Sequence, residues 1–182
     1  MKNVRWFIPS LMLAALLATG CFLISGQFLV TFELGNVNVT SSTGIDGVVV
    51  DLNTISEYAD HKENLKGLAD IAILGQFTNS GASAIDVEVW MVDNAGPLLT
   101  DAAQVRLDGT KVWGPFNLAA GATEDITWDK SAALFGAGKA ALLNQIKTDG
   151  IFTLYAIGPA GVSVYQFSVA NGKLIAVIDA GA

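Results

Sequence analysis

Acidic residues beside a tryptophan are the first candidates for chemistry in this sequence. Asp86, Glu88 and Trp90 alternate along "AIDVEVWMV", so in a strand their side chains would project from one face. Paired carboxylates near an aromatic ring are what a glycosidase or a sugar-binding site uses. Acids at alternate positions more commonly form the solvated face of a strand. We therefore predict a candidate ligand surface at Trp90, Asp86 and Glu88 and assign no catalytic residue.

The remaining titratable residues offer little for catalysis. Glu124, Asp125 and Asp129 gather in "TEDITWDK", where Asp129 is placed to cap a following helix. His61, the only histidine, lies in the charged segment "YADHKEN", which is typical of a solvated face. No GxSxG motif supplies a nucleophile for a serine hydrolase. We expect that the protein is not an enzyme.

Metal and phosphate sites lack their usual ligands. One histidine and one cysteine cannot form a zinc ligand set, and no D-x-D-x-D-G loop is present for calcium. The segment "FGAGKAALL" lacks the first glycine of a phosphate loop, and Ala140 stands where Ser or Thr must hold magnesium. We expect neither a metal nor a cofactor.

The first twenty residues have the three parts of a secretory signal. Lys2 and Arg5 form a positive region, Trp6–Leu17 is apolar, and Ala18–Gly20 is a run of small residues. Cys21, the only cysteine, follows directly. The sequence therefore predicts a signal peptide over residues 1–20 and a mature chain that begins at the thiol.

Gly20 and Cys21 in this position resemble the lipobox of bacterial lipoproteins, roughly Leu-Ala/Ser-Gly/Ala-Cys. The resemblance implies that diacylglycerol is attached to the Cys21 sulfur and that a fatty acid such as palmitate acylates the new amino group. Such chains hold a protein firmly on a bilayer. Ala18 stands where the family prefers leucine, which leaves two alternatives open. An ordinary signal peptidase would leave Cys21 as a free thiol, and residues 6–32, which carry no charge before Glu33, would also suit an uncleaved anchor.

All three interpretations imply export to the bacterial cell envelope. In lipoproteins of enteric-type bacteria, an aspartate after the cysteine retains the protein at the inner membrane. Phe22 occupies that position here. The resemblance therefore favours the outer membrane where a cell has two membranes.

Charge excludes one class of partner. The chain carries 10 Lys and Arg against 17 Asp and Glu, a formal net charge of −7. Residues 1–20 hold two basic residues and no acid, so their removal makes the rest more acidic. An acidic surface without a basic cluster repels phosphate backbones, and we expect no nucleic-acid partner.

Short alternating apolar runs separated by turn residues predict a mainly β fold over residues 21–182, as a single domain. The predicted strands are 27–34, 36–40, 47–52, 70–79, 84–92, 111–118, 123–128, 151–158, 161–169 and 173–180. Helices are expected only at 54–68 and 131–150. So few helices exclude a parallel sheet and favour an antiparallel sandwich or barrel.

The middle third also contains two short sequence motifs that occur in sandwich domains of secreted proteins. Phe77 and Asn79 give "F-x-N", and Leu118, Gly121 and Thr123 give "L-x-x-G-x-T" before a strand. This pairing resembles immunoglobulin-like domains and the sandwich domain of late-embryogenesis-abundant proteins. The resemblance implies an immunoglobulin-like β-sandwich with two short helices added, and it leaves the strand order open.

Together these features predict a non-catalytic cell-envelope lipoprotein that displays a binding or structural module. One alternative is a carbohydrate-binding or carbohydrate-active envelope protein that uses the acid and tryptophan surface. Another is an assembly factor for a larger envelope complex. The expected partners are the membrane, through the lipid, and an envelope protein or glycan. The sequence names neither a ligand nor an oligomeric state.

Overall fold

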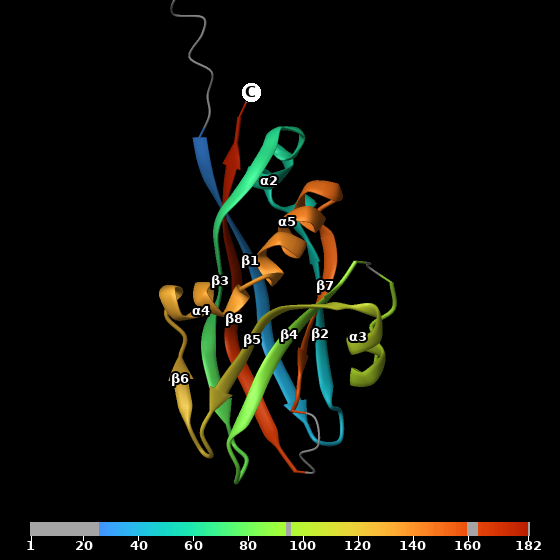
Figure 1. Cartoon of the computed structure of the whole chain (residues 1–182), viewed down its shortest axis with the longest axis vertical. Coiled ribbons are helices and arrows are strands. Elements are labelled where there is room, and N and C mark those ends of the chain that lie inside the picture. The colour runs from blue at the N-terminus through green and yellow to red at the C-terminus, as the bar shows by residue number, and fades with distance from the viewer. Residues whose placement is uncertain (1–25, 94–95, 160–163, 182) are drawn as a thin grey trace, which may run out of the picture.

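Two four-stranded antiparallel sheets pack face to face in the computed structural model, which describes residues 26–93, 96–159 and 164–181 (Figure 1). Sheet A has the order β1-β8-β3-β6 and sheet B the order β2-β7-β4-β5. The strands are β1 (Gly26–Thr40), β2 (Ile45–Asp51), β3 (Leu65–Asn79), β4 (Ile85–Val92), β5 (Thr110–Leu118), β6 (Thr123–Asp125), β7 (Ile151–Ile157) and β8 (Gln166–Ala180). The predicted signal peptide and Cys21 lie outside the described residues.

The strand order is that of a double-sheet jelly roll. The first strand pairs with the eighth, the second with the seventh, the third with the sixth and the fourth with the fifth. Two further ladders, β3 with β8 and β4 with β7, complete the sheets. The predicted mainly β antiparallel sandwich is confirmed, and the strand order that the sequence left open is now defined.

The two ends of the sandwich carry different segments. Gly26 and Leu65 both pair with Ala180, so the start of β1, the end of β8 and the region around α2 share one end, here called the α2 end (Figure 1). At the opposite end, here called the turn end, residues 41–44 connect β1 to β2. Within the described residues, the eight strands and the two buried apolar clusters come from residues 26–180.

Two predicted turns are β-bulges inside longer strands. The β1–β8 ladder shifts register around Gly35, which has φ 72°, where we expected a break between two strands. Asn171, with φ 54°, lies within β8 and not in a turn. Residues with positive φ distort a ladder without ending it. The described chain therefore has eight strands where the sequence suggested ten.

The predicted helix over residues 54–68 is wrong in length. Only Ser56–Ala59 (α2) is α-helical, between the 3-10 turns η1 (Leu52–Thr54) and η2 (Lys62–Asn64). Leu65 already belongs to β3 and is buried in the core. Tertiary packing of β3 against β8 therefore overrides the local helical pattern.

The second predicted helix, 131–150, is two helices separated at Gly136, which has φ 46°. They are α4 (Trp128–Phe135) and α5 (Gly138–Thr148). Asp129 is not the cap, because α4 begins one residue earlier and Thr127 is the N-cap. A helix that the sequence did not predict, α3 (Ala102–Asp108), begins at Asp101, whose side chain accepts a hydrogen bond from the N–H of Ala103.

The main core lies between the sheets and centres on three aromatic rings. The ring centroids of Phe77 and Trp113 are 5.6 Å apart, and Phe116 packs on both. Trp113 is fully buried, and its indole N–H donates to the backbone oxygen of Ser131 in α4. A second, smaller cluster lies on the outer face of sheet B beneath α3, whose Val105 is fully buried there.

The helices α4 and α5 protect an open edge of sheet A. Beyond its short ladder with β6, β3 has no neighbouring strand among the described residues on this side. There the Ile73 N–H donates to Ser131 Oγ at 2.7 Å, and Lys139 Nζ donates to the carbonyl of Ala69 at 2.6 Å. Covering an edge in this way prevents its pairing with other strands.

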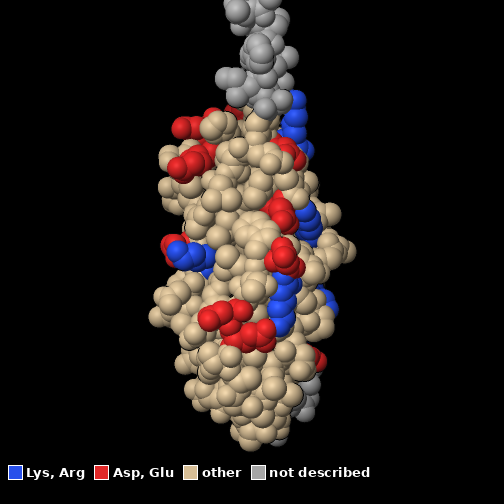
Figure 2. All heavy atoms as spheres, turned by 90° about the vertical axis from the view of Figure 1, so that its left-hand side faces the viewer, with Lys and Arg blue, Asp and Glu red and all other residues tan. Residues whose placement is uncertain are grey.

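No helix of the described chain is long and apolar enough to cross a membrane. On the side of the molecule shown in Figure 2, acidic and basic side chains are interspersed, with uncharged surface between them. The exposed ion pair Lys173–Glu33, at 2.9 Å, joins β8 to β1.

Candidate functional site

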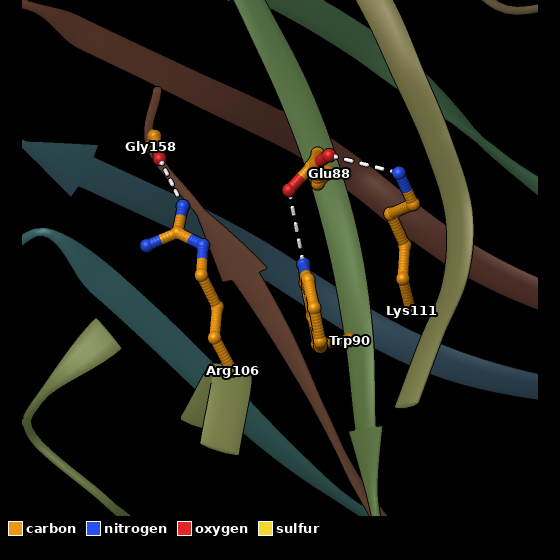
Figure 3. A network of polar contacts seen from close by, with 5 residues as sticks. All are labelled: Glu88, Trp90, Arg106, Lys111 and Gly158. Atoms are coloured by element: carbon orange, nitrogen blue, oxygen red, sulfur yellow. Dashed lines mark hydrogen bonds and ion pairs between the residues drawn. The ribbon is translucent and has the colours of Figure 1, made fainter. Parts of the chain in front are cut away.

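The predicted ligand surface at Trp90, Asp86 and Glu88 lies on the outer face of sheet B. Trp90 Nε1 donates to Glu88 Oε2 at 3.1 Å, and Lys111 Nζ on β5 donates to Glu88 Oε1 at 3.1 Å (Figure 3). Asp86 accepts a hydrogen bond from Asn117 Nδ2 at 3.0 Å. Both carboxylates therefore have side-chain partners on the neighbouring strand.

Trp90 is half-buried and not fully exposed as its strand pattern suggested. Its ring packs against the second cluster, as do the side chains of Leu99 and Ala102. Arg106 of α3 donates to the carbonyl of Gly158 at 2.9 Å, which fastens the helix to the residue that follows β7 (Figure 3). The aromatic ring therefore contributes to holding α3 on the sheet.

The second acidic group does not join the first. Glu124 and Asp125 lie on β6 in sheet A, whereas Asp86 and Glu88 lie on β4 in sheet B. Glu124 is paired with Lys130, and Asp125 accepts from Gln76 Nε2 at 3.2 Å. Hence the sequence-predicted acids form two separate, internally bonded groups.

His61 lies at the α2 end, apart from both acidic groups. Its Nδ1 is 2.8 Å from the backbone oxygen of Glu57, and its ring stacks on Phe28 of β1 at 4.8 Å between centroids. These contacts give it a packing role at the end of the sandwich. Within the described ranges, no three His, Cys, Asp or Glu side chains converge to hold a metal ion.

Asp46, which was not predicted from the sequence, is shared by two neighbouring cavities. In the β2–β7 ladder, Asp46 lies opposite Ala156 and Val48 lies opposite Leu154, so all four side chains are directed between the sheets. The sequence could have indicated it, because the alternation in "IDGVVVD" places Asp46 on the same strand face as Val48 and Val50. An acid on the apolar face of a strand needs a specific partner or an opening to solvent.

The inner cavity lies between the sheets and has a volume of about 40 Å³. Asp46 is the only polar side chain in its lining, which comprises Leu34, Val37, Asp46, Val48, Ile73, Phe77, Val87, Val89, Leu154, Ala156, Val169 and Gly172. The second cavity is an open hollow of about 390 Å³ lined by residues 42, 43, 45–47 and 98–100. Hydroxyl groups of Ser42, Thr43 and Thr100 and the apolar Leu98 contribute to its surface.

Two backbone groups fix the Asp46 carboxylate. Oδ2 accepts from the N–H of Asn38 on β1, and Oδ1 accepts from the N–H of Gly47, both at 2.9 Å. The first of these bonds joins the edge strands of the two sheets. Among the residues that the structure describes, no basic side chain forms an ion pair with Asp46.

Comparisons with known proteins do not assign a function. No family model and no curated protein match the chain. A solved structure of mud crab tombus-like virus is 12% identical, covers 87% of this chain and 82% of that chain, and gives a TM-score of 0.39. Desmodium yellow mottle tymovirus is 11% identical over 88% of this chain and 89% of that chain, with a TM-score of 0.33. Latent PorU from Porphyromonas gingivalis is 10% identical over 86% of this chain, spans it with only 13% of its own length, and gives 0.33.

Proposed function

We propose that this protein is a non-catalytic lipoprotein of the bacterial cell envelope that displays its β-sandwich as a binding module. The observation that carries the proposal is the position of Cys21, directly after the small residues of a lipobox-like signal and only five residues before Gly26 begins β1. Five residues span at most about 17 Å. An acyl group on Cys21 therefore holds the sandwich close to the bilayer.

The short tether also orients the molecule. Because β1 begins at the α2 end, that end faces the membrane and the turn end points away from it. Asp46 pairs with Ala156, one position from the turn end of the β2–β7 ladder. Its distance from Gly26 along β1 is about 40 Å, since a strand rises about 3.3 Å per residue. The two cavities are therefore accessible on a membrane-anchored protein.

The state of the acids supports a non-catalytic role. Glu88, Asp86, Glu124 and Asp125 each have a side-chain partner, and His61 stacks on a phenylalanine. General acid–base catalysis needs a titratable group placed against a substrate. The glycan alternative stays a prediction, which Trp90→Ala would test by loss of retention on immobilised glycans.

Metabolic labelling with an alkyne analogue of palmitate tests the lipid anchor. We expect the wild-type chain to take up label and to fractionate with membranes, and Cys21→Ser to do neither. Ser25→Ala, a small substitution just after the cysteine, is the matched control and should label like wild type. Absence of label on the wild-type chain, or equal label on Cys21→Ser, would refute the proposal.

A further inference from the structure

We propose that Arg106 and Tyr165 form a binding site for a single carboxylate group, the C-terminal carboxylate of a peptide that ends in apolar residues. The site lies at the turn end of the sandwich, where α3 is bonded to the residue after β7 and Tyr165 precedes β8. The inference rests on the function proposed above, because it names a ligand class for the binding module. It does not depend on acylation of Cys21, since both side chains belong to the described sandwich.

Gly158 brings the two side chains together. The Arg106 guanidinium donates to its carbonyl oxygen at 2.9 Å (Figure 3). A Cβ atom on Gly158 would lie 2.2 Å from the Tyr165 hydroxyl oxygen, so the phenol packs directly against this glycine. The same oxygen would be 3.8 Å from a Cβ atom on Gly44, in the turn between β1 and β2. The guanidinium and the hydroxyl therefore contact the same short piece of backbone, although they come from distant parts of the sequence.

The Tyr165 hydroxyl is available to a ligand. The side chain packs in the main core and is only 8% exposed, yet no described residue forms a hydrogen bond with its hydroxyl. Within the described ranges, every fully buried side-chain polar atom has a partner, so this unbonded oxygen must contact solvent. A tyrosine with a buried ring usually bonds its hydroxyl. Here the buried ring holds in place a donor that can bind an acceptor from outside.

Arg106 supplies the second donor. It is half-buried and forms no ion pair with any residue that the structure describes. Asp101 and Asp108, the acids of the same segment, each accept a hydrogen bond from another group. A guanidinium has five N–H groups, and one of them donates to Gly158. The others fit a carboxylate, the group with which arginine forms its strongest and best-oriented hydrogen bonds.

The donors match one negative charge and no more. The site has one basic side chain, and its other donor is a neutral phenol, because burial raises the pKa of Tyr165 and keeps the hydroxyl protonated at neutral pH. A carboxylate has two oxygens, so it can accept from the guanidinium and from the hydroxyl at once. The formal net charge of −7 repels ligands with many negative charges. A monocarboxylate is therefore the matching chemistry.

The apolar surroundings favour a peptide over an acidic sugar. Leu107 is 78% exposed and Val164 is 73% exposed, which makes them the two most exposed large apolar side chains of the described residues. They directly adjoin Arg106 and Tyr165 in the sequence. An extended peptide covers about 3.3 Å per residue, so its last few residues can reach them from a carboxylate held at the site. Capture of a C-terminal carboxylate is a recurring mode of peptide recognition.

Nuclear magnetic resonance titration of the full chain in neutral detergent micelles tests the proposal. The sequence has only two arginines, so Arg5→Lys identifies the side-chain Nε–H signal of Arg106. We expect the peptide acetyl-Ala-Leu-Leu to shift this signal saturably. Its C-terminal amide should bind about tenfold more weakly or worse, because the charge-assisted hydrogen bonds are lost. Equal binding of acid and amide, or no saturable shift of the Arg106 signal, would overturn the inference.

Two variants test the two donors separately. Tyr165→Phe removes only a hydroxyl and should weaken acetyl-Ala-Leu-Leu by about tenfold, and Arg106→Lys should do the same because lysine lacks the planar fork. Tyr58→Phe is the matched control, since it makes the same change at the α2 end and should bind like wild type. Equal binding by Tyr165→Phe and Tyr58→Phe contradicts the proposal. This comparison decides the question even if Arg106→Lys fails to fold.

Two other anions distinguish the ligand classes. Glucuronate and inorganic phosphate should each saturate the Arg106 signal only at higher concentration than acetyl-Ala-Leu-Leu. Tighter binding of glucuronate would assign the site to an acidic glycan, and tighter binding of phosphate would assign it to an inorganic anion, so either result overturns the peptide assignment. Palmitate labelling of wild type and Cys21→Ser measures the anchor independently, so failure of the carboxylate site is distinguishable from failure of the proposed function.

Discussion

Ser131 is a fully buried hydroxyl that joins three elements. From α4, its Oγ accepts the N–H of Ile73 on β3 at 2.7 Å and the indole N–H of Trp113 on β5 at 3.1 Å. Trp113 retains a second acceptor in the Ser131 backbone oxygen, whereas the Ile73 N–H lies on the side of β3 that faces away from β8. Buried N–H groups without partners are costly, so this hydroxyl stabilises the protected edge of sheet A.

Ser131→Ala should therefore lower the free energy of unfolding by about 1–3 kcal/mol, the cost of leaving a buried donor unsatisfied. Urea titration followed by tryptophan fluorescence measures the change. The matched control is Ser83→Ala in the exposed β3–β4 turn, which should stay within about 0.5 kcal/mol of wild type. Equal stabilities of the two variants would show that the Ser131 hydroxyl is dispensable.

The Asn79 side chain connects the two sequence motifs of the middle third, "F-x-N" and "L-x-x-G-x-T". Its side-chain N–H groups donate to the carbonyls of Leu118 and Ala119 at 3.1 and 3.0 Å, and its oxygen accepts from Gly81 at 2.9 Å. Gly121, with φ 67°, forms the turn after Ala119. The spacing of "F-x-N" and "L-x-x-G-x-T" was therefore informative, because one amide connects the end of β3 to the end of β5. Which side chain made the connection was not predictable without the strand order.

Asn79→Ala should lower the free energy of unfolding by about 2 kcal/mol or more, because several buried backbone groups lose their partner. Asn117→Ala provides the matched control, since its one bond to Asp86 is exposed and should be worth less than about 0.5 kcal/mol. Guanidinium denaturation of both variants gives the comparison. A loss at Asn117 as large as that at Asn79 would contradict this assignment.

Tyr58 makes stability depend on alkaline pH. Burial raises the pKa of its hydroxyl above 10.0, and the nearby carboxylates of Asp149, Asp51 and Glu63 raise it further. Burial also raises the pKa of Tyr165, which Arg106 partly offsets. Above pH 10 the unfolded chain loses these protons before the folded one, so the free energy of unfolding decreases as the pH rises. Below pH 10 this contribution is fully present.

Replacing Tyr58 with phenylalanine should reduce the slope of unfolding free energy against pH between pH 10 and 11. It should also lower stability at pH 7, by about 1 kcal/mol, because the hydroxyl donates to the carbonyl of Ile146 at 2.7 Å. Urea titrations at a series of pH values measure both effects. An unchanged slope in the variant would exclude Tyr58 as the titrating group.

At the scale of elements, local patterns predicted strands better than helices. Alternation defined β4 and a continuous apolar run defined β7 nearly to the residue, and each of these strands has a neighbouring strand on both sides. The helix predicted over residues 54–68 was too long because Leu65 and the residues after it are stabilised more by pairing with β8 than by a helix. The α3 helix, only seven residues long, has too short a pattern to stand out, and its packing on Tyr155 is a tertiary contact.

The start of α5 approaches β5 so closely that only glycine fits. A Cβ atom on Gly138 would overlap the backbone of Val112. Gly138→Ala should destabilise the fold by about 1–3 kcal/mol through overpacking, although alanine favours helices. A Cβ atom on Gly26 would meet nothing within 4 Å, so Gly26→Ala is the control and should leave the melting temperature unchanged. If the two variants have the same melting temperature, the absence of a side chain at Gly138 is not required for α5 to pack on β5.

At the scale of the whole molecule, the fold class was predictable and the topology was not. Turn spacing and the scarcity of helices indicated a sandwich, since both are local properties of the chain. Pairing of β1 with β8 joins opposite ends of the described chain, as in Gly26 with Ala180, and no local pattern encodes such a partner. The two cavities beside Asp46 were also not predictable, because they are formed by β2, β7 and residues 98–100, which are far apart in the sequence.

Removal of β8 should abolish the fold. A chain that ends at Gly158 lacks the strand between β1 and β3, so β1 has no partner in sheet A. We expect it to show no cooperative thermal transition, whereas residues 22–182 should give a far-ultraviolet circular dichroism spectrum dominated by strands. A cooperative transition in the shortened chain, or a helix-dominated spectrum of the longer one, would contradict the topology.

The inner positions of β7 and β8 also determine when the protein can fold. Each is the middle partner in its sheet, β7 between β2 and β4 and β8 between β1 and β3, and both come after the other six strands in the order of synthesis. Before the ribosome reaches residue 151, only the β3–β6 and β4–β5 ladders can form. Sheet A therefore cannot be completed until the eighth strand has been synthesised. The order of the strands along the chain therefore makes completion of both sheets a late event, which follows the synthesis of the last described strand.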